Sequence, residues 1–498
     1  MINKGGNTLT NVLVRMKILA RIFFRHLLKF KKLIYVLGDF GMNKKKLTFK
    51  NYLMIASLIF GMFFGAGNLI FPVHLGQLAG SHWLTAAIGF IISGILIPLA
   101  ALLALATTHA DGIYDLAKPL GSGVALTFLI LVHATLGPLF ATPRTATVPF
   151  AMFSSHFSKS TQPIALLIYS AVFFGLVYYF SLSEGKITER IGKILNPAFL
   201  ILLFVMFMFA FISPMGSTAT THAASGYING ASSFTNGFLE GYNTLDALAA
   251  LAFGITVVSA IHSFGLKNSK DTSTALAKTG ALGFAGIAVI YFILIFIGAT
   301  SLHYFKLSAN GGIAFAQIAN HYLGIIGEAL LATLATITCI STAIGLVVAF
   351  SQDFHKRFPK ISYRTFLTFN CGISFIIANF GLDTIISWST PVLMFLYPIA
   401  IALIFCGITS RIFKNDTIVY KFTVFFAIIP AIFDGINAAP SIITSTTFAK
   451  AMISFAGHYF PMFSLGLGWL SFGVAGYLIG LIAHFIKKYT VSSLEIAE

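Results

Sequence analysis

Residues 54–72 read MIASLIFGMFFGAGNLIFP, an apolar run long enough to cross a lipid bilayer as a single helix. Five residues that do not suit a continuous helix lie within the run: Gly61, Gly65, Gly67 and Asn68 near its centre and Pro72 at its end. Glycine weakens a helix, and non-helical backbone is tolerated at membrane depth only beside protein or a polar cavity. The stretch therefore predicts a membrane-spanning helix that breaks near its middle.

A second apolar run, five runs further along, carries the same kind of interruption. Residues 234–254 read FTNGFLEGYNTLDALAALAFG, where glycines and polar side chains precede a short apolar helix. Two breaks at this spacing are typical of two inverted five-helix repeats whose broken first helices face each other. Half-helix N-termini favour a carboxylate, and exposed carbonyls favour Na⁺ or an ammonium group. The alternative, that the glycines only let helices pack closely, explains one cluster better than it explains a matched pair.

The composition agrees with a membrane protein. The chain has 498 residues, of which 57% are hydrophobic and 9% charged, whereas soluble proteins average roughly 25% charged residues. Twelve apolar runs predict an all-α polytopic protein with twelve transmembrane helices and no room for a large soluble domain. The runs lie near 52–72, 83–107, 123–151, 162–182, 194–213, 237–260, 279–301, 323–350, 366–380, 391–410, 418–436 and 463–486.

The distribution of basic residues predicts the orientation of these helices. Sixteen Lys and Arg residues fall in loops on one side, and only Lys159, Lys306 and Lys450 fall on the other. Cytoplasmic loops carry the basic excess, so both termini are expected in the cytoplasm. The net charge of +17 therefore reflects membrane topology, and no nucleic-acid partner is expected.

The domain organisation follows from the same runs. Residues 1–42 form a basic extension, interpreted as dispensable or, alternatively, as a surface helix on anionic lipid. The membrane-spanning domain covers 43–490, with repeat one at about 52–213, repeat two at about 237–410 and two further helices at about 418–486. Residues 491–498 are a cytoplasmic tail.

Hydroxyl groups on the eighth run predict a cation site. Thr338, Ser341 and Thr342 are three and four residues apart, and therefore lie on one helix face. Beside freed backbone carbonyls they would offer the oxygen ligands that a small hard cation prefers. Serine and threonine in membrane helices also bond their own backbone, which is the alternative interpretation.

Ionisable residues inside the runs need a partner or water. Arg144, in GPLFATPRTATVPF at 137–150, lies well inside the third run. We interpret it as a structural or gating charge in preference to a direct substrate contact, with Glu240 and Asp246 as candidate partners or ion-coupling groups. Asp383 and Asp434 lie nearer the ends of their runs and are expected to be solvated.

Together these motifs resemble the branched-chain amino acid transport system II carriers, the leucine-isoleucine-valine cation symporter family of the amino acid–polyamine–organocation superfamily. The resemblance rests on FFGAGNLIFP with LGQLAG, GPLFATPRTATVPF, EGYNTLDALAALAFG and STAIGL, and runs from about residue 50 to 490. It implies a bacterial leucine transporter-type fold with unwound first and sixth helices. It also implies Na⁺-coupled uptake of leucine, isoleucine and valine; the alternatives are H⁺ coupling or another neutral amino acid.

The resemblance also implies the site residues. Substrate binding is expected at Gly65, Ala66, Gly67, Asn68, Tyr242, Asn243 and Thr244. The Na⁺ site is expected at Gly61, Phe64, Thr338, Ser341 and Thr342. No cofactor, obligate protein partner or enzymatic activity is expected, since no HExxH, GxSxG or Walker-type sequence is present. The expected location is the bacterial cell (inner) membrane.

Overall fold

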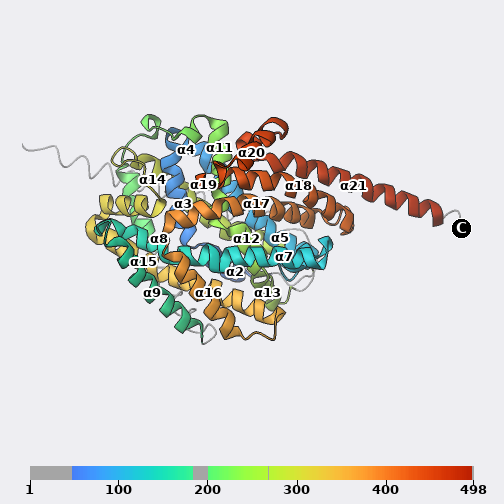
Figure 1. Ribbon diagram of the computed structural model, residues 1–498. Coiled ribbons are helices and arrows are strands. Elements are labelled where there is room, and N and C mark those ends of the chain that lie inside the picture. Colours follow the sequence, from blue (N-terminus) through green and yellow to red (C-terminus); the bar gives the residue numbers. More distant parts are fainter. Residues whose placement is uncertain (1–46, 183–199, 267–268, 496–498) are drawn as a thin grey trace, which may run out of the picture.

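The computed structural model describes residues 47–182, 200–266 and 269–495, and within these ranges the chain forms helices and no strands. The predicted extension at 1–42 lies outside the described residues, as do residues 496–498 of the predicted tail. The helices pack into a bundle from which α21 runs out toward the C-terminus (Figure 1).

The first half of the chain supplies the helices of the first six predicted runs. They are α2 (Phe49–Phe63), α3 (Ala66–Ala79), η1 (Gly80–His82), α4 (Trp83–Ile91), η2 (Ile92–Leu96), α5 (Ile97–Thr108), α6 (Ile113–Ala117), η3 (Lys118–Leu120), α7 (Ser122–Ala134), η4 (Thr135–Leu139), α8 (Ala141–Phe153), η5 (Ser154–His156), α9 (Gln162–Ser181), a helix at Leu200–Ile212, η6 (Thr218–Thr220), η7 (Ser225–Tyr227), α11 (Gly230–Glu240), η8 (Gly241–Thr244), α12 (Asp246–Phe253) and α13 (Ile255–Ser263).

The second half supplies the remaining helices. They are α14 (Ser269–Ser301), α15 (Gly311–Arg357), α16 (Tyr363–Ala378), α17 (Leu382–Thr409), α18 (Thr417–Asn437), α19 (Ser441–Thr444), α20 (Thr447–Tyr459), η9 (Phe463–Leu465) and α21 (Gly468–Glu495).

Among the described residues, eight helices are long and apolar enough to span a membrane, and the bent pair Gly230–Phe253 with Thr256–Ser263 makes a ninth. One of the eight, Ala66–Thr108, has 43 residues and would measure about 65 Å if straight, twice a bilayer core. It is broken at Gly80, where φ is 50° and ψ is −121°. The structure thus confirms the all-α membrane architecture, while the count of twelve spans stays a prediction.

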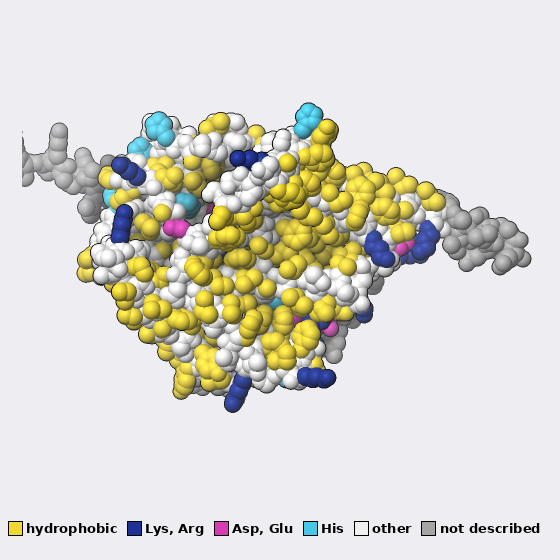
Figure 2. Space-filling view, in the orientation of Figure 1, with side chains coloured by type: hydrophobic (Ala, Val, Ile, Leu, Met, Phe, Trp, Pro, Cys, Tyr) yellow, Lys and Arg dark blue, Asp and Glu magenta, His cyan; other side chains and the backbone are white. Residues whose placement is uncertain are grey.

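Large apolar side chains on the outside of the bundle fit a lipid environment. Ile164, Val172 and Ile201 are each at least 60% exposed. Figure 2 shows hydrophobic side chains covering the visible face, with most Lys and Arg near its edges. Exposed apolar surface on this scale would be unfavourable in water, so the described helices are built to lie in a membrane.

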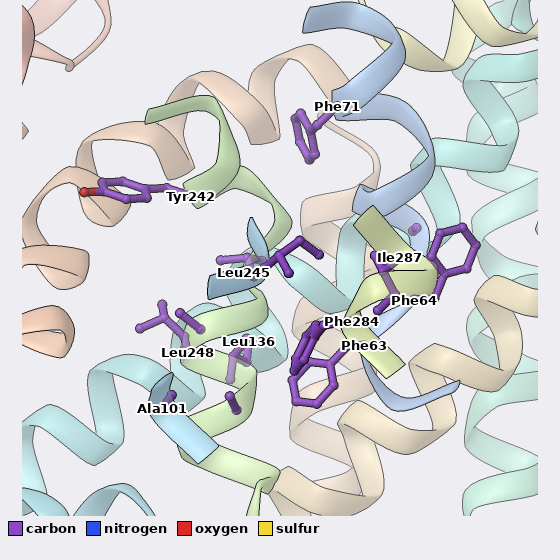
Figure 3. Close-up of a cluster of buried hydrophobic side chains, with 14 of the residues drawn as sticks. Phe63, Phe64, Phe71, Ala101, Leu136, Tyr242, Leu245, Leu248, Phe284 and Ile287 are labelled. Carbon is purple, nitrogen blue, oxygen red and sulfur yellow. The ribbon is translucent and has the colours of Figure 1, made fainter. Parts of the chain in front are cut away.

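The close packing of α3 against α14 positions the first break. A Cβ on Gly76 would lie 2.0 Å from the carbonyl oxygen of Ile295, and one on Gly298 would lie 2.1 Å from that of Val73. The two backbones therefore touch where only glycine fits. Phe63, the last residue of α2, packs beside Phe284 of α14 with ring centroids 5.1 Å apart (Figure 3).

A contact at the start of α18 joins this helix to α21. Asp416 caps the start of α18, accepting a hydrogen bond from the backbone N–H of Ile418 at 3.0 Å. Its other carboxylate oxygen lies 2.8 Å from Nδ1 of His484. The hydrogen bond with His484 holds the pKa of Asp416 below its ordinary value. The stabilisation is therefore present at neutral pH and is lost only as the pH falls through this lowered pKa.

Gly76→Ala tests the contact between α3 and α14. The methyl group would meet backbone atoms, which cannot rotate away, so we expect less folded protein and a lower apparent melting temperature on heating before size-exclusion chromatography. Gly345→Ala is the matched control, because no atom lies within 4 Å of its Cβ position. Alanine there should stabilise the helix by up to about 1 kcal/mol. Equal thermal stability of the two variants would contradict the packing argument.

Candidate functional site

The first predicted break is confirmed between α2 and α3. Phe64 (φ −81°, ψ 92°) and Gly65 (φ −122°, ψ −165°) both have extended backbone. The N–H of Gly65 donates to the side-chain Oδ1 of Asn68 at 3.0 Å, and so does not donate back to the carbonyl of Gly61. The last carbonyls of α2 are consequently left without helical donors, while the first amides of α3 point into the same gap.

The second predicted break is confirmed between α11 and α12. The turn η8 follows α11, and Leu245 then adopts a left-handed conformation (φ 65°, ψ 5°) before α12 begins at Asp246. Such a conformation is strained for a branched side chain. The hydroxyl of Thr244 donates to the carbonyl of Gly241 at 2.9 Å and closes the turn. Tyr242, Asn243 and Thr244 therefore all lie within the non-α-helical segment, as expected.

A buried hydrogen-bond network joins the two breaks. The side-chain amide of Asn68 donates to Oδ2 of Asp246 at 2.8 Å and is also bonded to the hydroxyl of Tyr291. Tyr291, on α14, donates to the same carboxylate oxygen at 3.0 Å. The three residues are 2%, 3% and 0% exposed. Asn68 thus caps the start of α3 through its Oδ1 and bonds the first residue of α12 through its Nδ2.

The two breaks also approach each other through their backbones. A Cβ on Gly67 would lie 3.5 Å from the carbonyl oxygen of Asn243 and 3.3 Å from the ring of Phe71. The side-chain amide of Asn243 donates to Oε2 of Glu240 at 3.3 Å. The predicted residues Gly67, Asn68, Asn243 and Asp246 are therefore brought together.

Arg144 reaches this same place from α8. It donates to the carbonyl of Asn243 at 3.0 Å and to the hydroxyl of Ser389 on α17. Its guanidinium lies 5.3 Å from the ring centroid of Phe71. Among the described residues Arg144 forms no direct ion pair with Glu240 or Asp246. Asn243 donates to Glu240, and Asn68 and Tyr291 donate to Asp246. Glu240 still lies near enough to attract the guanidinium, so its role as an electrostatic partner or ion-coupling group stays a prediction.

A third interruption, absent from the sequence analysis, positions Arg144. The π-helical turn η4 ends α7, and both Gly137 (φ −90°, ψ −116°) and Phe140 (φ −134°, ψ −58°) leave the helical region. α8 therefore begins near the middle of its span, with Arg144 close to its N-terminus. The pair Gly137–Pro138 was the available signal, since proline removes a backbone donor and glycine permits a bend.

The eighth-run hydroxyls lie partly as predicted. Thr342 on α15 contacts the first break, because its Cγ2 and Oγ1 lie 3.5 and 3.9 Å from the Cβ position of Gly65. Its hydroxyl also donates to the carbonyl of Thr338 at 3.1 Å. The hydroxyl of Thr338 is buried without a hydrogen-bond partner in the described part of the chain. Ser341 is half-buried beside them.

Two side chains lie differently from what the sequence suggested. The ring of Tyr242 stacks on Tyr397 of α17 at 4.0 Å, and Figure 3 shows it directed away from Phe71. Asp434, expected to be solvated, is only 3% exposed and lies against Gly468 at the start of α21. Asp383 is exposed, as expected, and accepts a hydrogen bond from Asn310 at 2.8 Å.

A cavity of about 600 Å³ lies between the ends of α5, α7, α12, α13 and α15. Its lining includes His109, Asp111 and Lys356. Asp353, on its wall, lies 3.1 Å from Nε2 of His133 and 3.3 Å from Nε of Arg357. The cavity opens on the side where the basic loops lie.

Tyr291→Phe tests the network between the breaks. Removing the hydroxyl takes one donor from the buried Asp246, so we expect a clearly lower apparent melting temperature. Asn68→Ala removes a second donor, and the double variant should lose less than the sum of the single losses, as expected for one network. Tyr179→Phe is the control, because that ring is 66% exposed. If the losses in melting temperature of the two single variants add up in the double variant, the three residues do not form one network.

Solved transporter structures share this fold. The chain superposes on the MhsT structure in complex with L-phenylalanine with a TM-score of 0.51 and 16% identity, covering 89% of this chain and all of that one. It superposes on inward-facing Mhp1 with a TM-score of 0.55 and 13% identity, covering 88% and 91%. These likenesses confirm the predicted fold class with its broken helices.

Sequence comparisons give the family. The family described as "Branched-chain amino acid transport protein" matches residues 48–487. The branched-chain amino acid permease BrnQ of Lactobacillus delbrueckii is 40% identical, over 86% of this chain and 95% of its own length. BrnQ of Bacillus subtilis is 36% identical, over 90% and 99%. This protein is thus a transporter and not an enzyme, and it belongs to the branched-chain amino acid transport protein family.

Proposed function

We propose that the protein imports leucine, isoleucine and valine by Na⁺-coupled symport. The observation that carries the proposal is the meeting of two broken helices at Asn68 and Asp246, which gathers free amides and carbonyls in an apolar surrounding. An amino acid needs that combination, because its charged ends require polar partners and an aliphatic side chain requires a dry pocket. The names of the relatives, branched-chain amino acid permeases, support the substrate class.

The proposed substrate site uses backbone on both sides of the gap. Gly65 is the N-cap of α3, and Ala66 and Gly67 are its first residues. The amides of the first turn have no acceptor within the helix, and together with the helix dipole they favour a carboxylate. The second break supplies oxygens to the ammonium group. They are the carbonyl of Thr244 and the side-chain Oδ1 of Asn243, which is buried without a hydrogen-bond partner among the described residues. Tyr242 contributes through its backbone, since its ring packs on Tyr397.

The proposed Na⁺ site lies between α2 and α15. The carbonyls of Gly61 and Phe64 end the first half-helix, where the negative end of the dipole favours a cation. The hydroxyls of Thr338, Ser341 and Thr342 complete an all-oxygen set of the kind that hard cations prefer. The support is the contact of Thr342 with Gly65 together with the unpartnered hydroxyl of Thr338.

The proposed location is the bacterial cell membrane with both termini in the cytoplasm. In that orientation the 600 Å³ cavity beside His109 and Lys356 faces the cytoplasm and is the route by which substrate leaves. Symmetry of the two repeats supports transport by alternating access around the central site.

Uptake into proteoliposomes tests the proposal and its coupling ion. Purified protein should accumulate radiolabelled leucine, isoleucine and valine under an inward Na⁺ gradient, and should not when choline replaces Na⁺. Accumulation driven equally well by a proton gradient in Na⁺-free buffer would establish H⁺ coupling instead. Accumulation of a different neutral amino acid alone would reject the proposed substrate.

Gly67→Leu tests the substrate site. The side chain would extend into the space between Phe71 and Asn243, so we expect leucine uptake to fall to background while the protein still inserts and purifies normally. Gly345→Leu, at a position with open space around it, should retain uptake. Uptake by Gly67→Leu at the level of this control would remove Gly67 from the site.

Thr342→Val tests the Na⁺ site. Valine keeps the shape of threonine and deletes one oxygen ligand, so the Na⁺ concentration for half-maximal uptake should rise about tenfold. Because ion and substrate binding are linked, leucine affinity should fall at low Na⁺ and recover at high Na⁺. Thr333→Val is the matched control, since this exposed threonine also bonds the carbonyl four residues before it. An unchanged Na⁺ dependence of Thr342→Val would reject the assignment.

A further inference from the structure

We propose that Arg144 binds the α-carboxylate of the transported amino acid. This inference rests on the proposed function, and it gives Arg144 a direct contact with substrate in place of the structural or gating role that the sequence favoured.

Arg144 is a buried cation whose direct contacts are all neutral. It is 2% exposed, and its hydrogen bonds go to a backbone carbonyl and a serine hydroxyl. Burying a guanidinium without a directly paired anion is costly. The two nearby carboxylates, Glu240 and Asp246, accept hydrogen bonds from other residues. Glu240 lies near enough to attract the guanidinium, but among the described residues no carboxylate is hydrogen-bonded to Arg144, which leaves room for a second anion in direct contact.

The guanidinium also has unused donors. It carries five N–H groups in a planar fork that matches the two oxygens of a carboxylate. Its Nε is buried with no hydrogen-bond partner among the described side chains and backbone. A carboxylate arriving from the substrate would satisfy this donor, whereas a purely structural arginine would be expected to have all its donors engaged.

The placement of Arg144 puts it at the proposed site. It donates to the carbonyl of Asn243 in the second break and lies over Phe71 of α3, one turn beyond Asn68. It also stands in the N-terminal part of α8, where the start of a helix within the span adds a favourable field for an anion. Three interrupted helices thus converge on one positive group.

Binding measurements with two ligands test the assignment. Leucinamide keeps the side chain and ammonium group of leucine but replaces the carboxylate by a neutral amide. Purified wild-type protein in nanodiscs should bind leucine much more tightly than leucinamide. Arg144→Gln should weaken leucine binding about 100-fold, in line with the loss of one partner of a buried charge pair, and leucinamide binding less than threefold.

Two further variants keep the test decisive. Arg144→Lys retains the charge without the fork, so it should fold even where glutamine does not, and should reduce the preference for leucine about tenfold. Arg357→Gln is the matched control, because that arginine pairs with Asp353 and lies over the ring of Tyr114. It should leave the preference for leucine over leucinamide unchanged.

The outcomes separate the two proposals. Equal losses of leucine and leucinamide binding in the Arg144 variants would overturn the carboxylate contact alone and leave branched-chain amino acid transport standing. Failure of the wild-type protein to bind leucine would overturn the proposed function, and this contact with it.

Discussion

The hydrogen bond from Asn68 to Asp246 is the interaction on which the rest of the site depends. A membrane interior offers no water to backbone groups freed from a helix, so each break must be stabilised by the protein itself. Asn68 does this for both breaks at once, by capping α3 and by holding the first residue of α12. Tyr291 adds a donor from α14. The gap between the half-helices therefore keeps a defined shape, with its amides and carbonyls directed toward a common space.

Local sequence was enough to predict the breaks and the hydroxyl face. The glycines at 61, 65 and 67 and the cluster around Tyr242 are unfavourable in an apolar helix, and their recurrence five runs apart indicates an interruption in each run. The start of the eighth run also coincides with a structural feature, because the run predicted from 323 begins at the kink that Gly324 (φ 65°, ψ −171°) makes inside α15. These features depend on backbone preferences within a few residues, which a single sequence contains.

Contacts between distant segments were not predictable in this way. Arg144 donates to Asn243 and Ser389 because of the way α8, η8 and α17 meet. The sequence indicated Glu240 and Asp246 instead, since opposite charges attract. The burial of Asp434 could not be predicted from its position near the end of a run, because it depends on where α21 begins. The direction of the Tyr242 ring is likewise decided by the stacking partner on α17. A third break at Gly137 had a local signal, but one shared with ordinary bends at proline.

The glycine contacts of α14 bear on how far the first break is able to bend. Gly76 holds α3 against α14, and a Cβ on Gly311 would lie 1.9 Å from the carbonyl oxygen of Ile70, so α15 holds α3 from another direction. On the other side of the break, a Cβ on Gly283 of α14 would lie 2.8 Å from the carbonyl oxygen of Ala56 on α2. Both half-helices therefore rest on one continuous helix. The gap keeps its width without regular backbone of its own, because α14 fixes the distance between its two ends.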